Sequence, residues 1–163
     1  MATSQEPRIR IRFDQDRRIC EPGETLSGEF FVDGSAAWDL RALEVSVLWY
    51  TEGKGDLDFA IHDFWRLSLD ATSSVQIPTQ RRPARFSTQL PEGPLSYRGL
   101  IVKLRWCVRV RGFGCDPGNE GIQAELPFQL GRTSAARLLR RNEPTTPTPV
   151  VESSPDHSAQ IGF

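Results

Sequence analysis

Residues 100–111 read Leu-Ile-Val-Lys-Leu-Arg-Trp-Cys-Val-Arg-Val-Arg, and this stretch decides the fold. Its apolar members occupy the even positions, Val102, Leu104, Trp106, Val108 and Val110. Its basic members occupy odd positions, Lys103, Arg105, Arg109 and Arg111. Because successive side chains of a strand point to opposite faces, this period of two predicts a core strand with one buried and one solvated face.

Six further stretches have the composition or alternation of strands, namely 8–13, 26–32, 42–51, 57–69, 85–90 and 122–130. Turn residues separate them, as in Glu21-Pro22-Gly23-Glu24 and in the stretch 112–121, which is rich in Gly, Asp, Asn and Pro taken together and predicts a loop. Asp63 and Phe64 break the alternation of their strand, which predicts a bulge or bend at 62–64. Since no stretch before residue 131 has a helical period, the sequence predicts an all-β fold, and strands of unequal length favour a sandwich.

A chain of 163 residues is long enough for one domain with its own core. We expect a flexible N-terminus over 1–7 and the β-sandwich domain over 8–131. A short basic linker over 132–142 has the composition to form two helical turns. Pro, Thr and Ser dominate 143–163, which predicts a disordered C-terminal tail because such a segment buries little apolar surface.

Composition excludes several classes of protein. The formal net charge is -1, so the overall field gives no reason to expect nucleic acid or an acidic substrate. No apolar run approaches the ~20 residues of a membrane-spanning helix, and the polar start has no signal peptide, so a cytoplasmic protein is expected. Cys20, Cys107 and Cys115 form no CxxC pair, which favours reduced thiols over a disulfide framework. A metal site formed by these three cysteines with His62 is the weaker alternative, and no cofactor or metal is expected.

Two sequence motifs, taken together with the long strand, indicate a resemblance to a known family. Residues 20–29 read CEPGETLSGE, and residues 86–99 read FSTQLPEGPLSYRG. Together with the strand at 100–111 they resemble the amino-terminal domain of the arrestin family, over residues 8–131. The resemblance implies an immunoglobulin-like, arrestin-like antiparallel β-sandwich that serves as an adaptor or scaffold without chemistry of its own. Arrestins carry two such sandwiches, so this chain is more similar in size to shortened arrestin-like proteins such as the sporulation-control proteins of bacteria.

Basic side chains on two strands are the candidate binding site. Arg8, Arg10 and Arg12 share one face of the first strand, and Lys103, Arg105, Arg109 and Arg111 share the outer face of the long strand. If the two strands are neighbours, these groups form a plate suited to phosphate or carboxylate. The alternative is a solvated face on which each Arg is opposed by Glu or Asp across a strand.

Other functional interpretations have less support. The long strand lacks the interleaved aromatic side chains of a nucleic-acid interface. Three tryptophans occupy apolar positions in the alternation of their strands and are expected in the core, namely Trp49, Trp65 and Trp106. Trp38 is expected in a loop. Catalysis is not expected, because His62 and His157 are the only histidines and no nucleophile motif accompanies them.

The sequence therefore predicts a non-enzymatic protein-interaction or scaffold domain. Its expected partner is another protein, phosphorylated or acidic, and a second copy could pair through exposed sheet edges. The alternative is a ligand-binding β-sandwich that recognises an anionic small molecule or a glycan.

Overall fold

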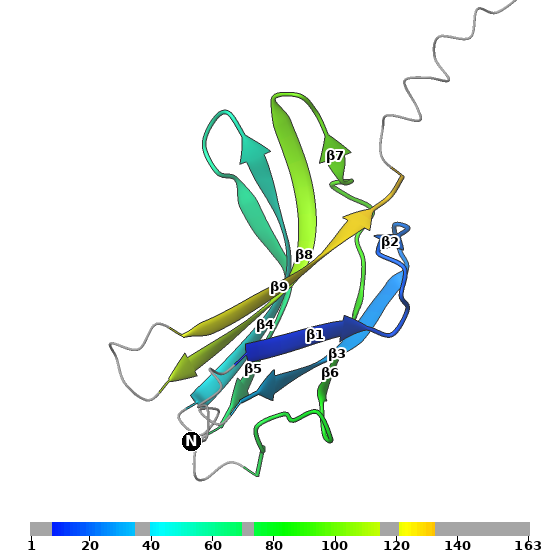
Figure 1. Cartoon of the computed structure of the whole chain (residues 1–163). Coiled ribbons are helices and arrows are strands. Elements are labelled where there is room, and N and C mark those ends of the chain that lie inside the picture. Colours follow the sequence, from blue (N-terminus) through cyan, green and yellow to red (C-terminus); the bar gives the residue numbers. More distant parts are fainter. Residues whose placement is uncertain (1–7, 35–39, 70–73, 115–120, 133–163) are drawn as a thin grey trace, which may run out of the picture.

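The computed structural model describes residues 8–34, 40–69, 74–114 and 121–132, and these form nine strands (Figure 1). The strands are β1 (Arg8–Phe13), β2 (Ile19–Cys20), β3 (Thr25–Asp33), β4 (Leu40–Gly53), β5 (Phe59–Ser68), β6 (Ala84–Gln89), β7 (Tyr97–Arg98), β8 (Val102–Gly114) and β9 (Ile122–Leu130). All lie within the range 8–131 predicted for the domain. The predicted N-terminus, linker after Arg132 and tail lie outside the described residues.

Two sheets form the sandwich. The smaller sheet has the order β1-β3-β6, and the larger has the order β2-β9-β8-β4-β5, with β7 pairing β8 beside this path. Every pairing between these strands is antiparallel except that of β2 with β9, which is parallel. The predicted all-β antiparallel sandwich is confirmed, with the short pairing of β2 and β9 as its one parallel pair.

The pairing of β4 with β8 is the longest in the molecule's described part, running from Leu40 opposite Gly114 to Gly53 opposite Val102. The strand predicted over 100–111 therefore begins two residues later and continues to Gly114, so the loop predicted from residue 112 was wrong at its start. Gly112 belongs to the ladder, since it pairs with Leu43 and with Ile122, and a Cβ there would lie only 2.8 Å from Ile122 Cγ1. A glycine in this place permits close packing, although it also resembles a turn signal.

The core lies between the two sheets and contains the predicted apolar face of β8. Val108 and Val110 are completely buried, and they face Val47 and Val45 across the ladder. Phe30 and Phe86 enter the same cluster from the smaller sheet. Burying side chains of this size stabilises the fold by roughly 1.5–3 kcal/mol each.

The predicted irregularity in β5 is confirmed as a bulge at His62. Val47 pairs with Asp63 and Leu48 pairs with Ile61, so His62 has no partner in the ladder. His62 Nε2 lies 2.8 Å from the carbonyl oxygen of Gln89, and Asp63 accepts a hydrogen bond of 2.8 Å from the Thr88 hydroxyl. Since Thr88 and Gln89 belong to β6, the bulge connects the edges of the two sheets.

Trp106 links the core to the segment before β7. Its indole is 1% exposed, and its Nε1–H donates a hydrogen bond of 2.8 Å to the carbonyl oxygen of Pro94. The His62 ring meets the same indole edge-on, with 6.1 Å between centroids. The hydrogen bond uses the indole N–H, and the contact with His62 uses the ring itself.

Replacing Trp106 by Phe should lower the free energy of unfolding by about 2 kcal/mol, because the Pro94 carbonyl loses its donor and part of the ring volume is left unfilled. Chemical denaturation monitored by far-UV circular dichroism measures the change. Trp65→Phe is the matched control, since Trp65 is only half-buried and has no hydrogen bond through its indole nitrogen among the described residues. Equal losses for the two variants would contradict this role of Trp106.

Candidate anion-binding site

A cavity of about 250 Å³ lies where β8 changes its partner. Lys103 and Leu104 pair with Arg98 and Tyr97 of β7, whereas β8 from Trp106 onward pairs with β9. The cavity opens beside the point where the partner of β8 changes from β7 to β9. The residues that line it come from β7, β8, the end of β9 and the start of β2, namely Arg18, Ile19, Ser96, Tyr97, Arg98, Lys103, Leu104, Arg105, Pro127, Phe128 and Gln129.

Four lining residues are basic, Arg18, Arg98, Lys103 and Arg105, and none is acidic. We refer to these four residues and the cavity as the basic pocket. Arg105 Nε forms an ion pair of 2.7 Å with Glu52. Arg18, Arg98 and Lys103 are exposed and form no ion pair within the described part of the chain. The pocket thus carries an excess of positive charge.

Backbone hydrogen bonds fix the floor of the basic pocket. Ser96 is buried, its N–H donates to the Leu130 carbonyl oxygen at 2.9 Å, and its hydroxyl oxygen accepts from the Leu130 N–H at 2.8 Å. The Gln129 N–H donates to the Arg18 carbonyl oxygen at 2.7 Å. A hydroxyl that accepts a hydrogen bond can still donate its own proton, so Ser96 adds a neutral donor to the basic groups. Guanidinium and hydroxyl donors together suit phosphate or carboxylate oxygens.

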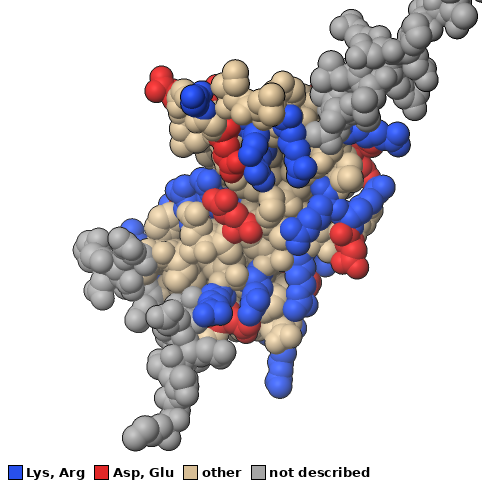
Figure 2. Space-filling view, turned by 45° about the horizontal axis from the view of Figure 1, so that its top comes forward, with Lys and Arg blue, Asp and Glu red and all other residues tan. Residues whose placement is uncertain are grey.

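The predicted basic plate is not formed, because its two strands belong to different sheets. Arg8, Arg10 and Arg12 lie on β1 in the smaller sheet, and the other four lie on β8 in the larger. Only Lys103 and Arg105 of the predicted residues line the basic pocket. Figure 2 shows Lys and Arg side chains on one face of the molecule, with Asp and Glu side chains between them.

Arg10 and Arg12 have acidic neighbours on β3. Arg10 lies 3.7 Å from Asp33, and Arg12 lies 3.9 Å from Glu29 and stacks over the Phe31 ring at 5.1 Å. These contacts match the alternative that each Arg is opposed by a carboxylate across a strand. Exposed pairs of this kind contribute at most about 1 kcal/mol.

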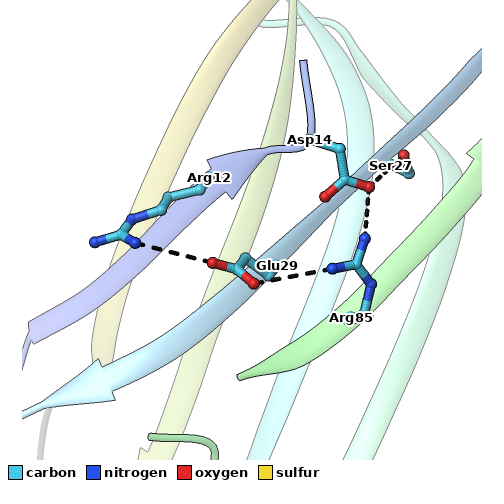
Figure 3. Close-up of polar contacts among 5 residues, drawn as sticks. All are labelled: Arg12, Asp14, Ser27, Glu29 and Arg85. Carbon is cyan, nitrogen blue, oxygen red and sulfur yellow. Dashed lines mark hydrogen bonds and ion pairs between the residues drawn. The ribbon is translucent and has the colours of Figure 1, made fainter. Parts of the chain in front are cut away.

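Figure 3 shows how these contacts continue across the smaller sheet. Asp14, just after β1, accepts hydrogen bonds from the Ser27 hydroxyl at 2.7 Å and from Arg85 at 2.6 Å. Arg85 also lies 3.9 Å from Glu29, which in turn faces Arg12. The bond from Ser27, together with Arg85, lowers the pKa of Asp14 below its ordinary value of 3.8 despite some desolvation.

The second half of β8 carries a mixture of paired and unpaired charges. Arg109 forms an ion pair of 2.8 Å with Glu125 of β9. Arg111, and Arg8 on β1, form no ion pair in the described residues. Whether any of these side chains binds a partner stays a prediction.

The cysteines that the structure describes, Cys20 and Cys107, are buried free thiols. Burial, with a smaller contribution from Glu125, raises the pKa of Cys107 to about 12. Cys115, Trp38 and His157 lie outside the described residues. Among the residues that are described, no three His, Cys, Asp or Glu side chains are placed to hold a metal ion, and no helix is long and apolar enough to cross a membrane.

Sequence reasoning missed two residues of the basic pocket, Arg18 and Arg98. Arg98 could have been found, because Gly99 marks a turn and the turn places Arg98 opposite Lys103. Arg18 reaches the pocket through the parallel pairing of β2 with β9, in which Ile19 lies opposite Gln129. A contact between residues so distant in sequence leaves no local signal.

Comparison with known proteins identifies the fold but not a family. No family model matches the sequence, and no curated protein matches it. The solved structure of the sporulation control protein Spo0M from Bacillus subtilis is similar, with 15% identity and a TM-score of 0.53. The match covers 77% of this chain and 49% of that chain, so the domain spans about half of Spo0M's length. A superoxide reductase (neelaredoxin) from Ignicoccus hospitalis matches with 10% identity over 80% of this chain and 88% of that chain, at a TM-score of only 0.44.

The class of the domain follows from these observations. It is an all-β sandwich of the arrestin-like kind, because Spo0M has that fold and its structure matches 77% of this chain at a TM-score above 0.5. The expectation of an arrestin-like sandwich is confirmed. At this level of identity the similarity concerns the fold alone.

Replacing Asp14 by Asn should destabilise the domain by about 1 kcal/mol at pH 7, since Arg85 then loses a charged acceptor. A carboxylate whose pKa is lowered on folding stabilises the fold fully above its unfolded pKa, and this contribution is lost as the pH falls through the folded pKa. The difference in free energy of unfolding between the two proteins should therefore shrink below about pH 4. Urea denaturation at several pH values measures it, with Asp16→Asn as control. A difference that does not depend on pH would contradict the assignment.

Proposed function

We propose that this domain is a non-enzymatic interaction module that holds an anionic group of a protein partner in the basic pocket. The group is a phosphate or a carboxylate. The partner is a protein with a phosphorylated or acidic segment, and the cytoplasm is the proposed location, where free thiols such as those of Cys20 and Cys107 stay reduced.

One observation carries the proposal: Arg18, Arg98 and Lys103 converge on one cavity without carboxylate partners in the described chain. Several Arg residues elsewhere on the strands are paired across the ladder, as Arg109 is with Glu125 and Arg66 is with Glu44. Unpaired like charges repel one another, and an incoming anion relieves this repulsion. Arg side chains also offer the two parallel donors that planar or tetrahedral oxyanions require.

The shape of the site favours a group on a larger molecule. The cavity is about 250 Å³, near the lower limit of pockets that enclose small-molecule ligands, and it is lined on one side by exposed Ile19 and Tyr97. These apolar side chains could contact the residues that flank an anionic side chain. The arrestin-like fold supports an interaction role, since the arrestin family is the one that the sequence resembles.

Absence of catalysis is part of the proposal. The basic pocket contains donors and positive charge, and its lining includes neither a carboxylate nor a histidine to transfer a proton. A site of this composition binds an anion.

Charge reversal in the pocket is the test. The full chain is titrated into fluorescent peptide pools that contain phosphoserine, aspartate or unmodified serine, and binding is followed by anisotropy. We expect phosphoserine or aspartate peptides to bind in a salt-sensitive way, and Arg98→Glu with Lys103→Glu to weaken binding by about 100-fold or more, because two attractive charges become repulsive.

Arg8→Glu with Arg111→Glu is the matched control, since it makes the same change of charge at two exposed residues outside the pocket. This control should leave peptide affinity within about threefold of the parent chain. Equal losses in both variants would show that binding follows overall charge, and the pocket would not be the site. Binding of inorganic phosphate or sulfated glycan alone, with no peptide bound, would favour the small-ligand alternative.

A further inference from the structure

Two turns project side by side from one end of the larger sheet (Figure 1). The first connects β4 to β5 and contains residues 54–58, and the second connects β7 to β8 and contains Gly99, Leu100 and Ile101. Gly53 lies opposite Val102 at the end of the β4–β8 ladder, and the Lys54 N–H donates to the Ile101 carbonyl oxygen at 3.2 Å. We refer to residues 54–58 and 98–103 together as the two-turn end.

Hydrogen bonds and a close backbone approach hold the two turns in place. Gly53 has a φ of 144°, and a Cβ at this position would lie 2.0 Å from the Ile101 carbonyl oxygen, so only glycine permits this approach. The first turn is closed by Thr51, whose N–H donates to the Asp58 carbonyl oxygen at 2.8 Å and whose hydroxyl accepts from the Asp58 N–H at 3.0 Å. The Gly99 N–H donates to the Val102 carbonyl oxygen at 3.0 Å within the second turn.

The two-turn end exposes aliphatic side chains to solvent. Leu100 is fully exposed, and Leu57 and Ile101 have relative exposures of 70% and 69%. Single exposed leucines are common, but three of the most exposed apolar side chains of the described chain lie here on adjoining turns. While they are exposed, these side chains contribute no burial energy to the folded monomer. Their burial against another surface would be favourable.

Charge is distributed unequally between the turns. Leu57 lies between Asp56 and Asp58, whereas Leu100 and Ile101 lie between Arg98 and Lys103. None of these four charged side chains forms an ion pair inside the described part of the monomer. Lys54 adds one positive charge to the first turn, which still has an excess of carboxylate.

This pattern is complementary to itself. A two-fold axis through the two-turn end places the first turn of one copy opposite the second turn of the other, and it does so twice. Each contact then joins an acidic turn with one leucine to a basic turn with two aliphatic residues. An anionic membrane would be repelled by Asp56 and Asp58, so the mixed charge favours protein over lipid.

We propose that the two-turn end is a homodimer interface, in which Asp56, Leu57 and Asp58 of one copy contact Arg98, Leu100, Ile101 and Lys103 of a second copy. This interface is distinct from the sheet-edge pairing considered above, because it uses turns and side chains instead of free backbone groups. Arg98 and Lys103 also line the basic pocket, so the interface and the anion site share these two side chains, whereas Asp56, Leu57, Leu100 and Ile101 belong to the interface alone.

Sedimentation equilibrium of the full chain tests the interface. The parent chain should form a dimer whose dissociation constant rises by about 10-fold or more for Leu100→Asp with Ile101→Asp, because two apolar contacts become repulsive carboxylates facing Asp56 and Asp58. Both positions are exposed and neither lines the basic pocket, but the new carboxylates flank Arg98 and Lys103, so Leu100→Ser with Ile101→Ser, which removes the apolar contacts without adding charge, is the variant that should retain peptide binding. That readout separates failure of the interface from failure of the anion site.

A charge exchange gives the sharper result. Asp56→Lys with Asp58→Lys, and separately Arg98→Asp with Lys103→Asp, should each be monomeric, because like-charged turns then meet. An equimolar mixture of the two variants should form a heterodimer with an affinity within about tenfold of the parent, since both contacts of the pair again join opposite charges. Arg81→Asp with Arg82→Asp changes the charge equally at an exposed turn elsewhere and should leave the dimer intact.

A parent chain that stays monomeric at all concentrations would overturn the proposal, as would a dimer unaffected by the turn variants or a mixture that does not associate. If the monomer instead sediments with phosphatidylserine vesicles and Leu100→Asp with Ile101→Asp abolishes this, the surface contacts lipid and the homodimer is wrong.

Discussion

The long antiparallel pairing of β4 with β8 is the constraint on which the rest of the structure depends. A ladder from Leu40–Gly114 to Gly53–Val102 fixes the direction of every side chain on both strands. It buries Val45, Val47, Val108 and Val110 on one face. A slip of one residue would expose this face and bury Arg109, so the apolar core specifies the register strongly.

The same ladder determines where the molecule can bind. Because β8 is longer than β7 and β9, which share its other edge, β7 pairs with its beginning and β9 with the remainder. The basic pocket lies at this change of partner, and the two-turn end lies where the ladder stops at Gly53 and Val102. The position of both candidate surfaces is therefore a consequence of one pairing.

Local patterns predicted seven of the nine described strands, the buried face of β8 and an irregularity at 62–64, because alternation is a property of neighbouring residues. They did not predict the two-residue strands β2 and β7, which are too short to alternate. They did not predict which strands share a sheet. Arg8 and Arg111 have the same alternation, yet β1 and β8 belong to different sheets, so the expected basic plate does not form. Arg18 escaped prediction for the same reason, since its place depends on a parallel pairing with β9 across more than a hundred residues. Gly112 shows the converse error, because it pairs with Leu43 and Ile122 inside the sheet although a glycine in the sequence reads as a turn signal.

The most direct test of the anion-binding account is a two-dimensional ¹H–¹⁵N NMR titration of the full chain with O-phosphoserine. The account predicts that amide shifts change around the basic pocket, at residues 18–19, 96–98, 103–105 and 128–129, and that these changes saturate. Shift changes centred on Arg8, Arg10 and Arg12, or no changes at millimolar ligand, would contradict it.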